Sequence, residues 1–201
     1  MKKTIILALM IITLCGCEKK EQECPEPEEK VYIKYSGTEL NADKVLELYN
    51  KDSFYSLMEN LKFEFIQKEF KDDKETQDKA TKFAEDTIAQ LETYYGEELL
   101  NAIEQNTNYK TVEEYKTYVY NSQLESKYLN NYILENNNME ITKEEDIDNS
   151  IIYRYYYEAL EKLFEKNKLS FPDKALETLY KEYMEDTKEQ YLEYAKQATE
   201  E

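Results

Sequence analysis

Over most of the chain after residue 53, apolar positions recur every three or four residues, which is the spacing of one face of an α-helix. The clearest case predicts a helix over 53–70, with Phe54, Leu57, Met58, Leu61 and Phe65 on one face. Further helices are predicted at 75–95, 97–105, 111–136, 151–166 and 175–198, and a shorter one around residues 43–48. Residues 31–35 alternate apolar and polar positions before Ser36-Gly37, which predicts a short strand or an extended arm that ends in a turn.

Helix-capping signals support these boundaries. The charged segment 71–74 is expected to end the first long helix, and Gly96 follows residue 95 where a C-cap glycine belongs. Thr111 and Glu114 form a capping-box pattern, and Pro172 suits the first turn of the last helix. With only three glycines and three prolines, we expect an all-α fold, an elongated multi-helix body with at most one short N-terminal β-strand.

Composition excludes several functions. The formal charge of −18 argues against a nucleic-acid partner, because phosphates require a basic surface. The chain contains no histidine, which removes the Ser-His-Asp and Cys-His catalytic arrangements and histidine-based zinc sites. The acidic runs at 72–73 and 144–146 lack the ligand spacing and the loop glycine of an EF-hand. We therefore assign no catalytic residue, no metal site and no cofactor, and we expect that the protein is not an enzyme.

The first residues have the pattern of an export signal. A basic start at 1–3 precedes an apolar run over residues 4–14, which is too short to span a membrane because a spanning helix needs about 20 residues. The run ends in Leu14-Cys15-Gly16-Cys17, which resembles the lipobox of bacterial lipoproteins. The resemblance implies that residues 1–16 are a signal peptide and that Cys17 carries a diacylglyceryl group and palmitate. The alternative is an ordinary cleaved signal with an incidental cysteine. The expected location is the cell membrane, lipid-anchored on its extracytoplasmic face.

Residues 17–30 are expected to form a flexible acidic tether behind the lipidated cysteine, because they are polar, contain proline and show no apolar periodicity. Cys24 is then the only thiol left after lipidation. It is either an unconstrained thiol or one that pairs between molecules. The oligomeric state is unknown from the sequence.

The order of elements resembles the N-terminal chaperone domain of SurA- and PrsA-type foldases, which is related to the peptide-binding part of trigger factor. The resemblance rests on the Tyr-Ser-Gly-Thr-Glu-Leu-Asn-Ala-Asp segment at 35–43, the Tyr-Gly-Glu-Glu-Leu corner at 95–99 and the Thr-Val-Glu-Glu-Tyr-Lys start of a helix at 111–116. It continues to the Met-Glu-Ile-Thr-Lys-Glu-Glu-Asp-Ile segment at 139–147. It implies a chaperone domain over 31–150.

After residue 150 the chain departs from that family. A parvulin prolyl isomerase of about a hundred glycine-rich residues would follow in PrsA-type proteins, whereas residues 151–201 contain neither glycine nor histidine. We therefore expect that the isomerase domain is missing. The C-terminal pair of helices is expected to pack on the chaperone domain or to extend it.

The resemblance implies a membrane-anchored chaperone or holdase that binds unfolded or exported polypeptides without catalysis. The twenty tyrosines offer broad contact surfaces with polar tips, although many are expected to fill the core. Four of them lie within 153–157 and cannot all face one core, so one or two should be exposed. Arg154, the only arginine, could hold a carboxylate of a ligand or form an ordinary ion pair. The alternatives are a surface scaffold for one specific partner and a residual prolyl isomerase family member. The candidate polypeptide-binding residues are Phe54, Leu57, Met58, Tyr115, Tyr128, Tyr132, Tyr153, Tyr155, Tyr156 and Tyr157.

Overall fold

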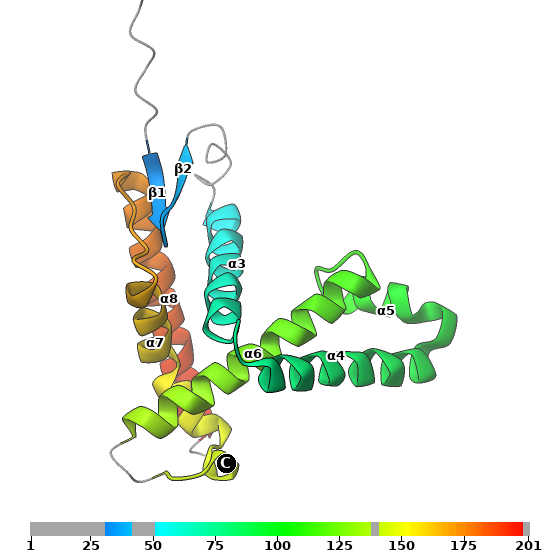
Figure 1. Ribbon diagram of the computed structural model, residues 1–201. Helices are drawn as coiled ribbons and strands as arrows, with labels where there is room; N and C mark the ends of the chain where they lie inside the picture. The colour runs from blue at the N-terminus through cyan, green and yellow to red at the C-terminus, as the bar shows by residue number, and fades with distance from the viewer. Residues whose placement is uncertain (1–30, 42–50, 138–140, 199–201) are drawn as a thin grey trace, which may run out of the picture. The chain divides into compact units, whose positions relative to one another are not determined.

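The computed structural model describes residues 31–41, 51–137 and 141–198 (Figure 1). Helices dominate these residues, and the fold is all-α as the sequence predicts. The predicted helix around 43–48, the predicted signal peptide, Cys17 and the tether lie outside the described residues. In order, the elements are β1 (Val31–Tyr35), β2 (Thr38–Asn41), α3 (Lys51–Glu69), α4 (Lys74–Tyr95), η2 (Gly96–Glu98), α5 (Leu99–Asn106), α6 (Val112–Asn136), η3 (Glu144–Asp146), α7 (Asn149–Lys166) and α8 (Lys174–Ala198).

The N-terminal strand has a partner that the sequence pattern did not predict. We expected at most one strand, but β2 pairs antiparallel with β1. Ser36 and Gly37 both have positive φ values, 43° and 85°. Two successive residues of this kind reverse the chain tightly and bring the following residues back along the first strand. The second strand was missed because Thr38–Asn41 contains a single apolar residue and so shows little alternation.

The hairpin is bound to the connection between α7 and α8. Lys34 and Ser170 exchange two backbone hydrogen bonds, of 2.9 and 2.8 Å, and the Ser36 amide donates to the Asn167 carbonyl at 2.9 Å. Ile33 of β1 is fully buried in the same core as the long helices. The first and last parts of the described chain are therefore fixed to each other.

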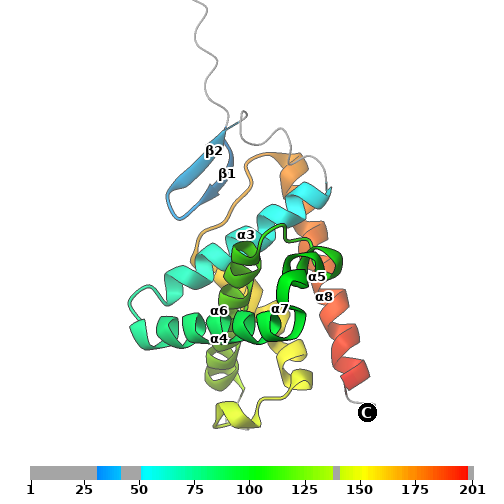
Figure 2. The ribbon, with the colours of Figure 1, turned by 90° about the vertical axis from the view of Figure 1, so that its right-hand side faces the viewer.

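The main core lies among α3, α6, α7 and α8 (Figures 1 and 2), where α3 and α7 each contact the other three helices. The 3–4 spacing of apolar residues places one face of each helix in this core. Helix α3 contributes Phe54, Met58, Leu61 and Phe65 to this core, and each of these side chains is at most 2% exposed. The C-terminal helices α7 and α8 thus pack back on α3 and α6 and share their core, instead of extending away from them.

A second, small core lies among α4, α5 and the first turns of α6. It contains Ile88, Leu99 and Ile103, and Tyr115 packs against it. Figure 2 shows α4 lying across α6, where the small residues Ala80 and Ala84 are buried. Helix α6 therefore contributes its first turns to the small core and its later turns to the main core.

Three of the predicted helix-end signals are confirmed and one is not, while α3, α5 and α7 begin two residues away from their predicted starts. Asp73 caps α4 and Gly96 ends it with a φ of 54°, while Thr111 and Glu114 form both hydrogen bonds of a capping box at the start of α6. Pro172 was expected in the first turn of the last helix, but it precedes the cap. The Asp173 carboxylate accepts hydrogen bonds from the amides of Ala175 and Leu176 at 3.0 and 3.3 Å, so Asp173 is the capping residue.

Candidate functional site

Several candidate binding residues prove to be core residues. Phe54 and Met58 are fully buried and Tyr156 is 6% exposed, so these three side chains have almost no surface to offer a polypeptide. Leu57, Tyr128, Tyr132 and Tyr157 are half-buried and pack against the main core, while Tyr115 packs against the small core. The apolar faces that the sequence suggested as a binding cradle are used for folding, because α7 and α8 cover them.

The tyrosines at 153–157 are also less exposed than expected. Tyr153, Tyr155 and Tyr157 are half-buried and Tyr156 is buried, whereas Arg154 is the exposed member of the group. For Tyr153 the reason is α8, because the ring centroids of Tyr191 and Tyr194 lie 6.0 and 5.4 Å from that of Tyr153.

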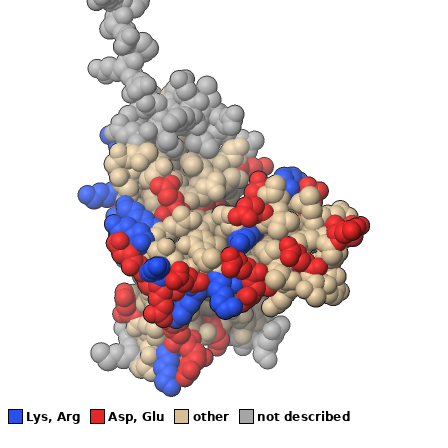
Figure 3. All heavy atoms as spheres, turned by 45° about the vertical axis from the view of Figure 1, so that its right-hand side comes forward, with Lys and Arg blue, Asp and Glu red and all other residues tan. Residues whose placement is uncertain are grey.

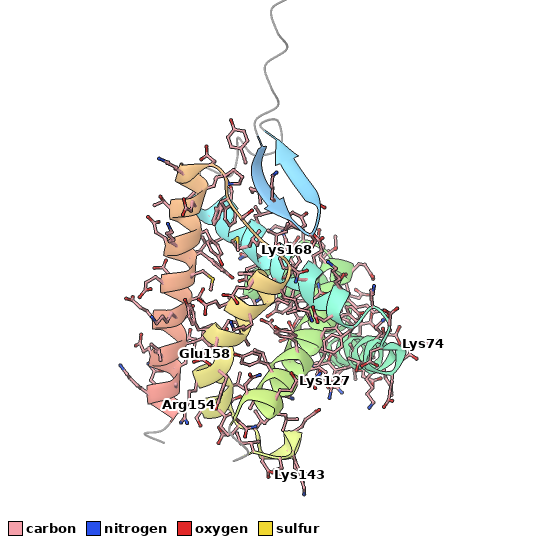
Figure 4. All side chains as sticks on the ribbon, turned by 60° about the vertical axis from the view of Figure 1, so that its left-hand side comes forward. Lys74, Lys127, Lys143, Arg154, Glu158 and Lys168 are labelled. Atoms are coloured by element: carbon pink, nitrogen blue, oxygen red, sulfur yellow. The ribbon has the colours of Figure 1, made fainter. Side chains whose placement is uncertain are left out.

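Arg154 lies near the start of α7, one turn before Glu158 (Figure 4). Among the described residues, no carboxylate lies within ion-pairing distance of Arg154, so the ordinary ion pair considered from the sequence is not formed there. Its charge makes a minor contribution to lowering the pKa of Asp148, behind the hydrogen bonds from Ser150 and Ile151.

Two adjoining cavities define the site that remains open, and we call them together the aromatic groove. The inner cavity, of about 330 Å³, lies between α3, α6, α7 and α8. The outer cavity, of about 570 Å³, lies between α3, the segment 108–111 and the first half of α6. Phe63 and Tyr118 line both cavities. The aromatic groove is lined by the rings of Phe63, Tyr109, Tyr118, Tyr153, Tyr156 and Tyr191.

The rings of the aromatic groove are in contact with one another. The ring centroids of Phe63 and Tyr118 are 6.4 Å apart, and those of Tyr109 and Tyr118 are 5.1 Å apart with their planes inclined by 33°. Tyr118 is 39% exposed even though it contacts three other rings. This exposed area, bounded by aromatic neighbours, is the part of the groove on which a ligand could pack.

A charged network lies at the base of the inner cavity. Lys62 is 4% exposed, and its ammonium nitrogen lies 2.6 Å from Glu59 Oε2 and 2.9 Å from Glu125 Oε1. The same nitrogen donates to the Tyr156 hydroxyl at 3.1 Å. Tyr156 in turn donates to Glu125 Oε1, and Tyr183 donates to Glu59 Oε1, each at 2.8 Å.

The network sets the ionisation of its members. Burial alone lowers the pKa of Lys62, but the charges of Glu125 and Glu59 outweigh burial and raise the pKa above its usual range. Burial, followed by the charge of a neighbouring glutamate, raises the pKa of Tyr156 and of Tyr183. At neutral pH the network therefore holds a charged lysine and protonated phenols.

A third cavity, of about 560 Å³, lies between α4 and α6 and differs in character. Its lining is mostly polar, with Phe83 as its only aromatic ring. Lys127, on α6 in Figure 4, pairs there with Glu144. It differs from the aromatic groove in having a single ring, so an aromatic ligand would find one stacking partner there instead of several.

The described residues offer no sign of a metal centre or a membrane span. Among residues 31–41, 51–137 and 141–198, no cluster of three or more histidine, cysteine or acidic side chains is placed to hold a metal ion. Within the same residues, no helix has the length and apolar character needed to cross a membrane.

The sequence pattern missed Phe63, Tyr109, Tyr118 and Tyr191. Phe63 and Tyr118 lie outside the apolar faces of their helices, and a large aromatic side chain outside the buried face must be partly exposed. That position was the available signal for a binding role. Tyr109 lies between helices and has no periodicity to mark it. The sequence does not predict which of these rings contact one another, because they lie on different segments of the chain.

No protein-family model, curated protein or solved structure matches the chain. The resemblance to SurA- and PrsA-type chaperone domains therefore stays a prediction from the motifs quoted above.

Proposed function

We propose that the protein is a lipid-anchored, extracytoplasmic holdase that binds unfolded or exported polypeptides in the aromatic groove without catalysis. The observation that carries this proposal is Tyr118, which is 39% exposed at the junction of the two cavities and is surrounded by other rings. The predicted lipid on Cys17 would hold the groove close to the membrane surface where exported chains emerge.

The chemistry of the groove suits weak binding of many sequences. Tyrosine provides a large, rigid contact area at a low entropy cost, and its hydroxyl group accepts or donates a hydrogen bond to a peptide backbone. The exposed Asn60 in the outer cavity adds an amide group that could bind backbone atoms irrespective of sequence. An extended segment with apolar side chains would use both kinds of contact.

The surface charge favours the same function. Acidic and basic side chains are mixed over the face in Figure 3, with uncharged surface between them. The net charge of −18 opposes adhesion of the folded part to the anionic membrane to which the lipid would tether it, and it opposes association with other copies of the chain. A protein that holds aggregation-prone chains benefits from both effects.

The test is an aggregation assay with the chain from residue 18 onward, which contains all the described elements. Two unrelated proteins are unfolded in its presence, and light scattering is recorded with the wild type and with a Phe63→Ala/Tyr118→Ala variant. The matched control is Phe83→Ala/Tyr94→Ala, which removes two rings that are 47% and 81% exposed and lie outside the aromatic groove.

The proposal is supported if the wild type and the control both suppress the aggregation of both client proteins. The groove variant should suppress aggregation several-fold less while keeping its helical circular dichroism. Suppression of neither client by the wild type overturns it. A saturable one-to-one complex with a single partner, without general suppression, would instead favour the scaffold alternative.

A further inference from the structure

The inner cavity has an unbalanced charge. Its charged lining residues are Glu59, Glu125 and Lys62, two carboxylates and one ammonium group. The ammonium of Lys62 has three donors, and these are used by Glu59, Glu125 and the Tyr156 hydroxyl. One more positive charge would make the cavity neutral.

Glu125 is the group on which that charge would act. Its Oε1 accepts from both Lys62 and Tyr156, whereas its Oε2 accepts no hydrogen bond from any described residue. The side chain is 16% exposed. A carboxylate oxygen that lines the cavity without a donor from the described residues gains much from a charged donor, because charge-assisted hydrogen bonds are the stronger class.

The rings beside Glu125 favour a cation over a neutral group. Phe63, Tyr118 and Tyr153 line the same cavity. Aromatic faces attract ammonium and guanidinium groups, and the ammonium of Lys62 already lies 4.8 Å from the centroid of the Phe63 ring. The carboxylate and the rings thus select the same kind of ligand group.

We propose that the inner cavity binds the cationic side chain of a lysine or arginine in the client polypeptide, with Glu125 as its anion partner. The apolar neighbours of that residue then pack in the outer cavity against Tyr118 and Tyr109. This inference rests on the proposed function and names its substrate class: segments in which a basic residue adjoins aromatic or aliphatic ones. An acidic chain attracts such segments from a distance, and the cavity recognises them at contact.

The experiment measures fluorescence anisotropy of labelled peptides against the chain from residue 18 onward at about 0.15 M salt. The probes are three Ser/Gly peptides with Phe-Lys-Leu, Phe-Gln-Leu or Phe-Glu-Leu at their centre. We expect the lysine peptide to bind about tenfold more tightly than the glutamine peptide, and the glutamate peptide to bind most weakly.

The matched variants separate the cavity from the overall charge. Glu125→Gln keeps the size of the side chain and leaves Lys62 paired with Glu59, and we expect the lysine and glutamine peptides to bind it within about twofold of each other. Glu177→Gln on α8 removes the same charge from a surface pair with Lys181 outside the groove, and it should preserve the tenfold preference.

Equal binding of the three peptides to the wild type overturns this inference and leaves the proposed function standing. This comparison uses the wild type alone, so it does not depend on whether a variant folds. Binding of none of them contradicts the proposed function itself. If the preference for the lysine peptide survives in Glu125→Gln, or falls equally in both variants, the preference comes from the net charge of the chain. Either result also overturns the inference.

Discussion

The Lys62 ammonium on α3 lies 2.9 Å from the Glu125 carboxylate on α6, and Tyr156 on α7 donates a hydrogen bond to the same carboxylate oxygen. Three helices are thereby joined by one polar network at the edge of the main core. A buried ion pair loses much of its attraction to the cost of removing the charges from water, but removing one partner alone leaves the other charge buried without compensation. Here the network fixes the floor of the aromatic groove.

Removing the lysine from this network should be strongly destabilising. We expect Lys62→Met to lower the free energy of unfolding by about 3 kcal/mol, because it leaves a largely buried Glu125 without its partner. Urea unfolding followed by circular dichroism measures the change. The triple variant Lys62→Met/Glu59→Gln/Glu125→Gln should recover part of the loss, and a stable single variant would show that the network contributes little.

Alkaline pH should unfold the protein over a defined range. Burial, with a smaller contribution from Glu161, raises the pKa of Tyr180 to about 12, against about 10 for tyrosine in an unfolded chain. Because the pKa of Tyr180 is higher in the folded chain than in the unfolded chain, its phenol makes its full contribution to folding stability below pH ~10. This contribution is lost as the pH rises towards the folded pKa, since the unfolded chain releases its phenolic protons first. We expect helix content to fall between about pH 10 and 12.

Tyrosinate absorbance and far-UV circular dichroism, recorded together, test this titration. The two signals should change together in the upper part of the range. Tyr180→Phe should move the transition to higher pH, whereas the exposed Tyr94→Phe should leave it in place. Complete tyrosinate formation with helices intact would contradict the prediction.

A glycine at position 168 should stabilise the fold. Lys168 follows α7 with a φ of 55°, and the amides of Lys168 and Leu169 bond back to the carbonyls of Glu165 and Phe164. This is the Schellman arrangement, in which the left-handed position favours glycine. We expect Lys168→Gly to raise the free energy of unfolding by about 0.5–1 kcal/mol.

Lys168→Ala is the matched control in urea unfolding. It removes the same charge but keeps a Cβ in the left-handed conformation, so no comparable gain is expected. Alanine and glycine variants of equal stability would show that the conformation of this residue does not limit stability.

Lipidation should depend on a single cysteine. We expect Cys17→Ser to move the protein from the membrane fraction to the soluble fraction and to abolish incorporation of labelled palmitate, since the lipobox resemblance assigns the thioether to this sulfur. Cys15→Ser, two residues earlier, should retain both. Membrane association of Cys17→Ser would contradict the predicted anchor.

Local sequence signals were sufficient to predict the long helices to within two residues of their observed ends. The spacing of Phe54, Met58 and Leu61 identified α3, and Thr111 with Glu114 identified the start of α6, because helix periodicity and capping depend on residues within one or two turns. The hairpin partner of β1 and the position of Pro172 were not predicted, since both depend on how a turn or a cap orients the next few residues.

The chain by itself thus determined an all-α fold, the approximate positions of its long helices and the exclusion of histidine chemistry. Only the tertiary structure decided which aromatic rings are buried and which line the groove. Phe54 has the pattern of a binding residue, but α7 and α8 cover it. The place of Tyr118 outside the apolar face of its helix indicated exposure, but not that it would lie beside Phe63. Helix periodicity shows that a face is apolar, but whether a neighbouring helix or the solvent covers that face depends on contacts between residues far apart in the sequence.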